Sequence, residues 1–404
     1  MHEELVERRR WISEGRFLHA LNYCMLLPGP EAQQLATYIG WLMHRTWGGI
    51  VAGGLFVLPS VFILIALSWV YLAHGDVPVV AGLFYGIKPA VVAIVLVAAH
   101  RIGSRALKNS WLWAIAAAAF IALFAFGVPF PAIVITAGLI GYFGGRYAPE
   151  RFSAAGAHAT ARAGYGPAII DDGTPTPPHA LFRWPKLWAY AAFGMAMWAI
   201  AIVGLYRLDE TLFEMGWFFT KAALLTFGGA YAVLPYVYQG AVEHYGWLSA
   251  TQMIDGLALG ETTPGPLIMV VAFVGFVGAW TQAIFGESLA AAGIAGALVA
   301  TFFTFLPSFV FILVGAPFIE TTHGDLRFTA PLTAITAAVV GVVLNLAVFF
   351  AYHVLWPAGL EGRFEWFSAL LGIAAFVALV RFKAGVIPVI AASAAIGLVA
   401  SLLF

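Results

Sequence analysis

The chain has 404 residues, of which 62% are hydrophobic and 10% are charged, with Lys+Arg and Asp+Glu equal at 20 each. Soluble domains carry about a quarter charged residues, so a single soluble domain and a disordered chain are both excluded. The neutral balance gives no indication of nucleic-acid binding, and the single cysteine, Cys24, leaves no intramolecular disulfide framework. The composition is typical of an all-α polytopic membrane protein.

Apolar segments of membrane-spanning length follow one another along the chain. A helix that crosses the hydrocarbon core needs about 20 apolar residues. Continuous candidates are residues 48–73, 79–99, 111–126, 129–145, 187–206, 212–236, 290–319, 329–354, 364–381 and 385–403. The hydrophilic stretch 146–186 is rich in Pro, Gly and Asp, and we expect it to be a flexible linker.

Two further apolar segments, 17–45 and 251–280, are each interrupted by the same tripeptide, Pro28-Gly29-Pro30 and Pro264-Gly265-Pro266. Two prolines that flank a glycine stop a helix, because proline lacks an N–H group and clashes with the preceding turn. Each segment then consists of two half-helices, which are too short to span the membrane twice. The pattern predicts re-entrant or broken helices at both tripeptides.

The chain contains an internal repeat. An offset of 236 residues places 6–30 on 242–266, and an offset of 248 places Leu58-Pro59-Ser60 on Leu306-Pro307-Ser308. We therefore predict two tandem homologous repeats, over 1–145 and 187–404, joined by the linker 146–186. Basic loops place the linker in the cytoplasm. A spanning 187–206 would make the halves parallel, whereas transporter architecture favours inverted repeats.

The first half has no counterpart of the helix at 212–236, because Met1 aligns with Val237. Two explanations are open: the helix was lost, or the chain starts at an internal methionine of a longer reading frame. We favour the second, and in-frame coding sequence upstream with an FGG-containing helix would support it.

Several motifs resemble the chromate ion transporter (CHR) family of the long two-domain type. They are VERRRWIS (6–13), LLPGPEAQQLATYIG (26–40), AGGLFVLPS (52–60), FYGIKPAVVAIV (84–95), TFGGAYAVLPYV (226–237) and TPGPLIMVVAFVG (263–275). The resemblance implies export of chromate across the bacterial inner membrane, driven by the proton motive force, with sulfate as the natural competitor. The chain departs from the family by lacking the first-half FGG helix.

Candidate substrate-binding residues lie at the helix breaks. An oxyanion needs donors in place of water, and helix N-termini inside the membrane provide them. The two tripeptides begin such half-helices. Neighbouring polar donors and paired glycines add to the set, although each break could also be a packed turn. The additional candidates are Gln33, Gln34, Thr262, Thr263, Gly228 and Gly229.

Charged residues inside apolar segments are the other candidates, since a charge in the membrane is costly. Lys88 and Lys221 are candidates for attracting the anion, with snorkelling as the alternative. Glu31 and Glu261 are candidates for proton coupling. Asp255 is a weaker candidate, and we interpret it as a solvated residue at the hairpin entrance.

The sequence therefore predicts a secondary transporter that exports chromate or a similar oxyanion. A passive oxyanion channel and a sulfate transporter of the same fold are alternatives. A membrane-embedded enzyme is disfavoured, because no HExxH, CxxC, GxSxG or P-loop pattern occurs. We expect no metal or cofactor. The expected partners are the anion and the lipid bilayer, with a homodimer as an option.

Overall fold

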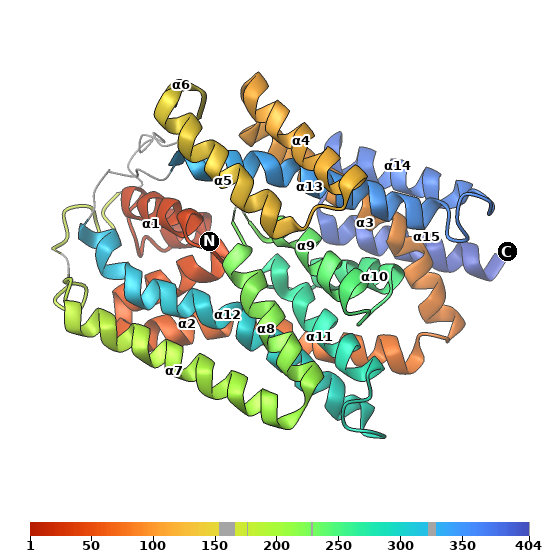
Figure 1. Ribbon diagram of the computed structural model, residues 1–404, viewed down its shortest axis with the longest axis horizontal. Coiled ribbons are helices and arrows are strands. Elements are labelled where there is room, and N and C mark those ends of the chain that lie inside the picture. Colours follow the sequence, from red (N-terminus) through yellow and green to blue (C-terminus); the bar gives the residue numbers. More distant parts are fainter. Residues whose placement is uncertain (153–165, 176, 228, 322–328, 404) are drawn as a thin grey trace.

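The computed structural model describes residues 1–152, 166–175, 177–227, 229–321 and 329–403. These residues form helices, as the composition predicted (Figure 1). The helices are α1 (Glu14–Leu26), α2 (Glu31–His74), α3 (Pro78–Ala106), α4 (Ser110–Phe126), α5 (Phe130–Tyr147), α6 (Pro149–Phe152), α7 (Trp184–Leu208), α8 (Glu210–Leu225), α9 (Ala230–Tyr238), α10 (Ala250–Thr262), α11 (Val270–Thr281), α12 (Leu289–Thr321), α13 (Thr329–Leu355), α14 (Trp366–Val380) and α15 (Val386–Leu403). Short turns of helix are η1 (Glu3–Arg8), η2 (Gln239–His244) and η3 (Leu267–Met269).

Six helices of the described residues, α2, α3, α7, α12, α13 and α15, are long and apolar enough to cross a bilayer. The buried fraction of each of these helices shows whether it lies at the centre or at the periphery of the bundle. The most apolar stretch of α13 is 67% buried, whereas that of α7 is 11% buried. Since apolar side chains on the outside of such a bundle face lipid, α13 lies at the centre and α7 at the rim. The protein is a multi-pass membrane protein.

The chain leaves the helix at both Pro-Gly-Pro tripeptides. The first separates α1 from α2, and the second separates α10 from η3 and α11. Gly29 has φ +124° and Gly265 has φ +144°. Side chains rarely adopt this backbone region, so glycine is required at both turns. The 13 residues of α1 and of α10 span about 20 Å each, which is too short to cross the membrane.

Two predicted interruptions of apolar sequence are found in the structure. The segment 212–236 is broken between α8 and α9, where Gly229 has φ +107°, as its paired glycines indicated. The second arm of the first hairpin and the helix predicted at 48–73 are two helices, together labelled α2, which meet at a kink where Arg45 has φ +59°. The chain turns back there, because a Cβ at Gly40 would lie against Gly48 and Ala52.

The two repeats are visible in the fold. Residue offsets of 236 relate α1 to α10, and offsets of 256 relate α4 to α14 and α5 to α15. Helices of each repeat pack against helices of the other repeat. Gly86 of α3 lies against Gly397 of α15, and Gly141 of α5 lies against Ala334 of α13. These two contacts are equivalent under the repeat, which establishes an approximate two-fold relation between the halves.

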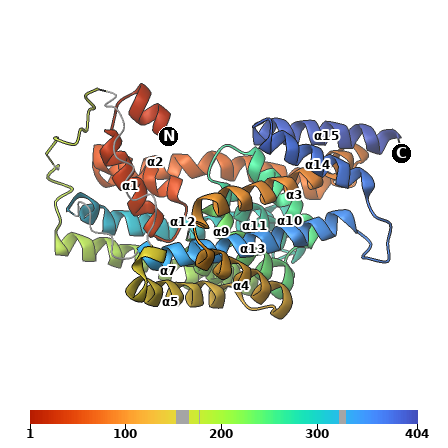
Figure 2. The same cartoon turned by 90° about the horizontal axis from the view of Figure 1, so that it is seen from above.

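The repeats run in opposite directions. In Figure 1, α2 ends at the right of the molecule, whereas its counterpart α12 ends at the left, near the start of α7. Figure 2 shows α14 and α15 at the end opposite the N-terminus. A spanning 187–206 makes the halves parallel only on the assumption that 212–236 crosses the membrane as one unbroken helix. The break between α8 and α9 removes that assumption, so a spanning α7 is compatible with inverted repeats.

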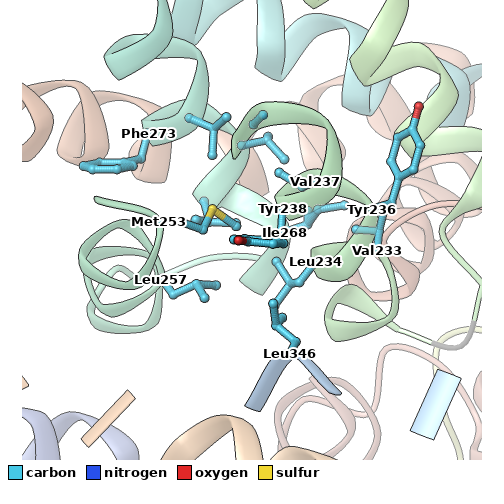
Figure 3. Close-up of a cluster of buried hydrophobic side chains, with 14 of the residues drawn as sticks. Val233, Leu234, Tyr236, Val237, Tyr238, Met253, Leu257, Ile268, Phe273 and Leu346 are labelled. Carbon is cyan, nitrogen blue, oxygen red and sulfur yellow. The ribbon is translucent and has the colours of Figure 1, made fainter. Parts of the chain in front are cut away.

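The largest core lies where the second hairpin meets α9 and α13. Tyr238, Met253, Leu257, Phe273 and Leu346 pack together there, from the four helices α9, α10, α11 and α13 (Figure 3). Their burial removes apolar surface that neither hairpin arm could cover alone. This core holds the second hairpin inside the bundle.

The described part of the 146–186 segment is docked, in contrast to the predicted flexible linker. Ile170 pairs with Ile12 in an isolated parallel bridge. The hydroxyl of Ser13 donates to Asp172 Oδ1 at 2.6 Å, and Ala180 is fully buried. The turn-forming composition of the segment gave no indication of these partners, which lie about 160 residues away in sequence.

Candidate functional site

Each Pro-Gly-Pro turn docks on a serine of the opposite repeat. Gln34 Nε2 donates to the Pro28 carbonyl at 2.8 Å and to Ser308 Oγ at 3.4 Å. In the second hairpin, Ser60 Oγ donates to the Pro264 carbonyl. Because Ser60 and Ser308 are equivalent under the repeat, the two contacts form a crossed pair. The breaks of both hairpins therefore lie against the middle of the two long helices.

The docking is close enough to exclude any side chain at the glycines. A Cβ atom at Gly29 would lie 2.2 Å from Ser308 Oγ, and one at Gly265 would lie 2.0 Å from Ser60 Oγ. Both serines are completely buried. These serines belong to the duplicated Leu-Pro-Ser motif but were not among the predicted site residues. Duplication of a polar residue inside an apolar segment was the signal that could have found them.

The break between α8 and α9 joins the same region. The N–H group of Gly29 donates to the carbonyl of Thr226 at 2.8 Å. Gly229 precedes the first turn of α9, and Gly228 lies outside the described residues. α9 in turn contacts η3, the turn of helix that follows the second tripeptide. Three helix breaks thus lie close together inside the bundle.

Helices that begin at these breaks have no side-chain cap within the described structure. They are α2 after Pro30, η3 and α11 after Pro266, and α9 after Gly229. Away from the breaks, α3, α5, α7 and α14 also lack a side-chain cap, whereas α1, α4, α8 and α10 are capped by Ser13, Asn109, Asp209 and Ser249. An uncapped N-terminus leaves backbone N–H donors without intrahelical partners, and its dipole favours an anion. The centre of the bundle therefore offers donors suited to an oxyanion.

The polar side chains predicted as donors are engaged within the protein. Gln33 Nε2 donates to Thr37 Oγ1 at 3.0 Å. The hydroxyls of Thr262 and Thr263 donate to carbonyls of their own helix at 2.8 and 2.9 Å. The buried amide oxygens of Gln33 and Gln34 have no hydrogen-bond partner among the described residues. These side chains would have to exchange partners to bind an anion.

Lys88 forms an ion pair inside the bundle. Its Nζ lies 3.7 Å from Asp255 Oδ2, and the hydroxyl of Tyr71 donates to the same oxygen at 2.9 Å. Asp255 is 2% exposed, so the interpretation of it as a solvated residue was wrong. Its position in the interior of α10, packed against α3 and α2, explains the burial. We refer to Tyr71, Lys88 and Asp255 as the Lys88 triad.

The remaining predicted residues are spread over other elements. Lys221 is half-buried on α8, which packs against α7 and α12, whereas Lys88 is on α3, which packs against α13 to α15. Glu31 is the first residue of α2. Glu261 lies near the end of α10 and accepts a hydrogen bond from the hydroxyl of Tyr231. The structure gives no contact that joins the two lysines or the two glutamates.

A second buried ionic cluster was not predicted. Arg16 Nη1 lies 3.6 Å from Glu320 Oε2, and their side chains are 12% and 5% exposed. Tyr38 donates its hydroxyl to Glu320. We refer to these three residues as the Arg16 triad. It attaches the first hairpin to α12, as the Lys88 triad attaches the second hairpin to α2 and α3.

A cavity of about 230 Å³ lies elsewhere, between the α4–α5 turn, α9 and α13. Gln239, Glu243 and Asn345 are among its lining residues. None of the residues predicted from sequence lines it. We therefore place the candidate site at the three helix breaks and the Lys88 triad rather than in this cavity.

Comparison with known proteins gives one consistent result. The chain is 30% identical to the chromate transport protein of Cupriavidus metallidurans over 404 residues, which covers 99% of this chain and 87% of that protein. It is 32% identical to the chromate transport protein of Pseudomonas aeruginosa, over 92% of this chain and 82% of the relative. An uncharacterized transporter of Bacillus subtilis, YwrA, is 31% identical over 27% of this chain. No solved structure matches the chain.

The family model described as chromate transporter matches residues 1–142 and 213–398. The gap between the two segments contains the linker and α7, so the match follows the two repeats seen in the fold. The tandem membrane repeats, the paired helix breaks and the length of the matches agree with the resemblance found in the sequence. The chain belongs to the chromate transporter family.

Proposed function

We propose that this protein is a secondary transporter that exports chromate from the bacterial cytoplasm across the inner membrane, driven by the proton motive force. The observation that carries the proposal is the set of three uncapped helix N-termini close together inside an apolar bundle. The similarity to proteins named chromate transport proteins supports chromate as the anion.

Chromate is a tetrahedral dianion that loses its hydration shell on entering the bundle. Backbone N–H groups at the ends of α2, α9 and α11 replace part of that shell, because their dipoles point toward the breaks. Lys88 adds a full positive charge where α3 meets the second hairpin. Sulfate has the same shape and charge, so we expect it to compete with chromate for the site.

The inverted repeats support a carrier that exposes the central breaks alternately to the two sides of the membrane. In this proposal the domains are the repeats 1–145 and 187–404, with 146–186 on the cytoplasmic side. Glu31 and Glu261 are the proposed proton-coupling residues. Both lie next to a helix break, so protonation there would change the charge that the substrate meets.

Chromate uptake into everted membrane vesicles tests the proposal. Vesicles that contain the protein should accumulate chromate against its gradient, an uncoupler should abolish the accumulation, and excess sulfate should reduce the initial rate. Vesicles without the protein are the control. Uptake that never exceeds equilibrium and is insensitive to the uncoupler would indicate a passive oxyanion channel. Accumulation of sulfate with no uptake of chromate would indicate a sulfate transporter.

A further inference from the structure

The Lys88 triad contains a carboxylate with one unused oxygen. Asp255 Oδ2 receives the hydroxyl of Tyr71 and faces Lys88, whereas Asp255 Oδ1 is buried without a hydrogen-bond partner among the described residues. The side chain of Lys88 is 26% exposed and that of Asp255 is 3% exposed. The lysine side chain is therefore partly exposed, whereas the carboxylate is enclosed by the protein.

A structural role alone does not account for this arrangement. Buried ion pairs contribute little net stability, because desolvation of the two charges offsets their attraction. Ionisable residues at membrane depth are expected to serve transport by default. Tyr71 is fixed by ring contacts with Phe84 and Phe273 at centroid distances of 4.9 and 5.5 Å, so its hydroxyl holds the carboxylate in one position.

The repeat shows that the hairpin can dock without this triad. The residues equivalent to Asp255, Lys88 and Tyr71 are His19, Thr336 and Ile319. The first hairpin instead carries the cation, Arg16, and attaches to a carboxylate on α12. Since the two hairpins share one architecture, the Lys88 triad is specific to one side of the transporter rather than a requirement of the fold.

We propose that the Asp255 carboxylate is an internal substitute for the substrate: it occupies Lys88 when no oxyanion is bound, and the dianion displaces it. This inference rests on the proposed function. A dianion attracts Lys88 about twice as strongly as a single carboxylate at the same distance. Once bound, it repels the Asp255 carboxylate and weakens the attachment of α10 to α3. Substrate binding is thereby linked to movement of the second hairpin.

The test is the KM for chromate in everted vesicles. Asp255→Asn removes the competing charge while keeping the shape, so KM should fall by about fivefold or more. In the Lys88→Met background the same change should lower KM less, because no cation remains to compete for and only the repulsion between the dianion and the carboxylate is lost. Glu3→Gln, in an exposed ion pair with Arg8, is the matched control and should leave KM unchanged.

Hydrogen exchange of the purified wild-type protein gives a second readout that needs no variant. Saturating chromate should accelerate amide exchange in α10 relative to α1. An unchanged or raised KM in folded Asp255→Asn protein, or slowed exchange in α10, would overturn the inference while chromate transport stands. Absence of chromate uptake by wild-type vesicles would overturn the proposed function and this inference together.

Discussion

The crossed docking of the two Pro-Gly-Pro turns predicts a large and specific cost for a single methyl group. Alanine at Gly29 would hold a side chain at φ +124°, with its Cβ 2.2 Å from Ser308 Oγ and 2.7 Å from Gln34 Nε2. The backbone strain costs about 1–3 kcal/mol. Overpacking of a buried contact costs about 1–3 kcal/mol more. We expect Gly29→Ala to lower the free energy of unfolding by about 2–6 kcal/mol.

The two contributions can be separated by a second substitution. Ser308→Ala removes the clashing hydroxyl and leaves φ unchanged, so Gly29→Ala/Ser308→Ala should recover only the packing part, about 1–3 kcal/mol. Reversible unfolding in mixed detergent micelles measures these differences. Gly54→Ala is the control, because a Cβ at Gly54, inside α2, meets no atom within 4 Å. Its expected effect is a gain of up to about 1 kcal/mol.

Two results would refute this reasoning. Gly29→Ala could prove as stable as Gly54→Ala, which would mean that the turn does not lie against α12 as described. Alternatively, Ser308→Ala could fail to recover any of the loss, which would place the cost elsewhere than in the contact with the serine.

Two further changes test the docking of the hairpins. Glu320→Gln leaves Arg16 buried without its counter-charge, so we expect the free energy of unfolding to fall by about 3–5 kcal/mol. Glu3→Gln on the surface is the control and should change it by no more than about 0.5 kcal/mol. Equal effects of the two substitutions would show that the Arg16 triad is not buried. Ser60→Ala removes the hydroxyl that donates to the Pro264 carbonyl, and thermal unfolding should reveal a loss of about 1–3 kcal/mol. A gain in stability in Ser60→Ala would contradict that hydrogen bond.

Local features of the sequence predicted much of the fold. The positions of Pro28-Gly29-Pro30 and Pro264-Gly265-Pro266 located both breaks, because proline and glycine act on the backbone within a turn. The duplicated Leu-Pro-Ser motif showed the repeat. Residue pattern alone left the relative direction of the halves open, since it gave no indication of whether the chain between α7 and α10 crosses the membrane once or turns back.

The partners within the site could not be predicted in the same way. Gln34 and Ser308 are 274 residues apart, and Tyr71 and Asp255 are 184 residues apart. Such contacts depend on which helices pack together, and hydrophobic periodicity does not specify this in helices that are apolar on every face. Lys88 was therefore predicted as a site residue without its partner, and Asp255 was misplaced at the hairpin entrance.

The central claim is that the dianion binds at the helix breaks with Lys88 as its cation. The most direct test is the KM for chromate of Lys88→Met/Asp255→Asn, which removes the cation without leaving an unpaired buried charge. Exposed Lys186→Met is the control. We predict a rise in KM of about tenfold or more, equivalent to about 1.4 kcal/mol, with the control unchanged. A folded double variant with the KM of the wild-type protein would contradict the account.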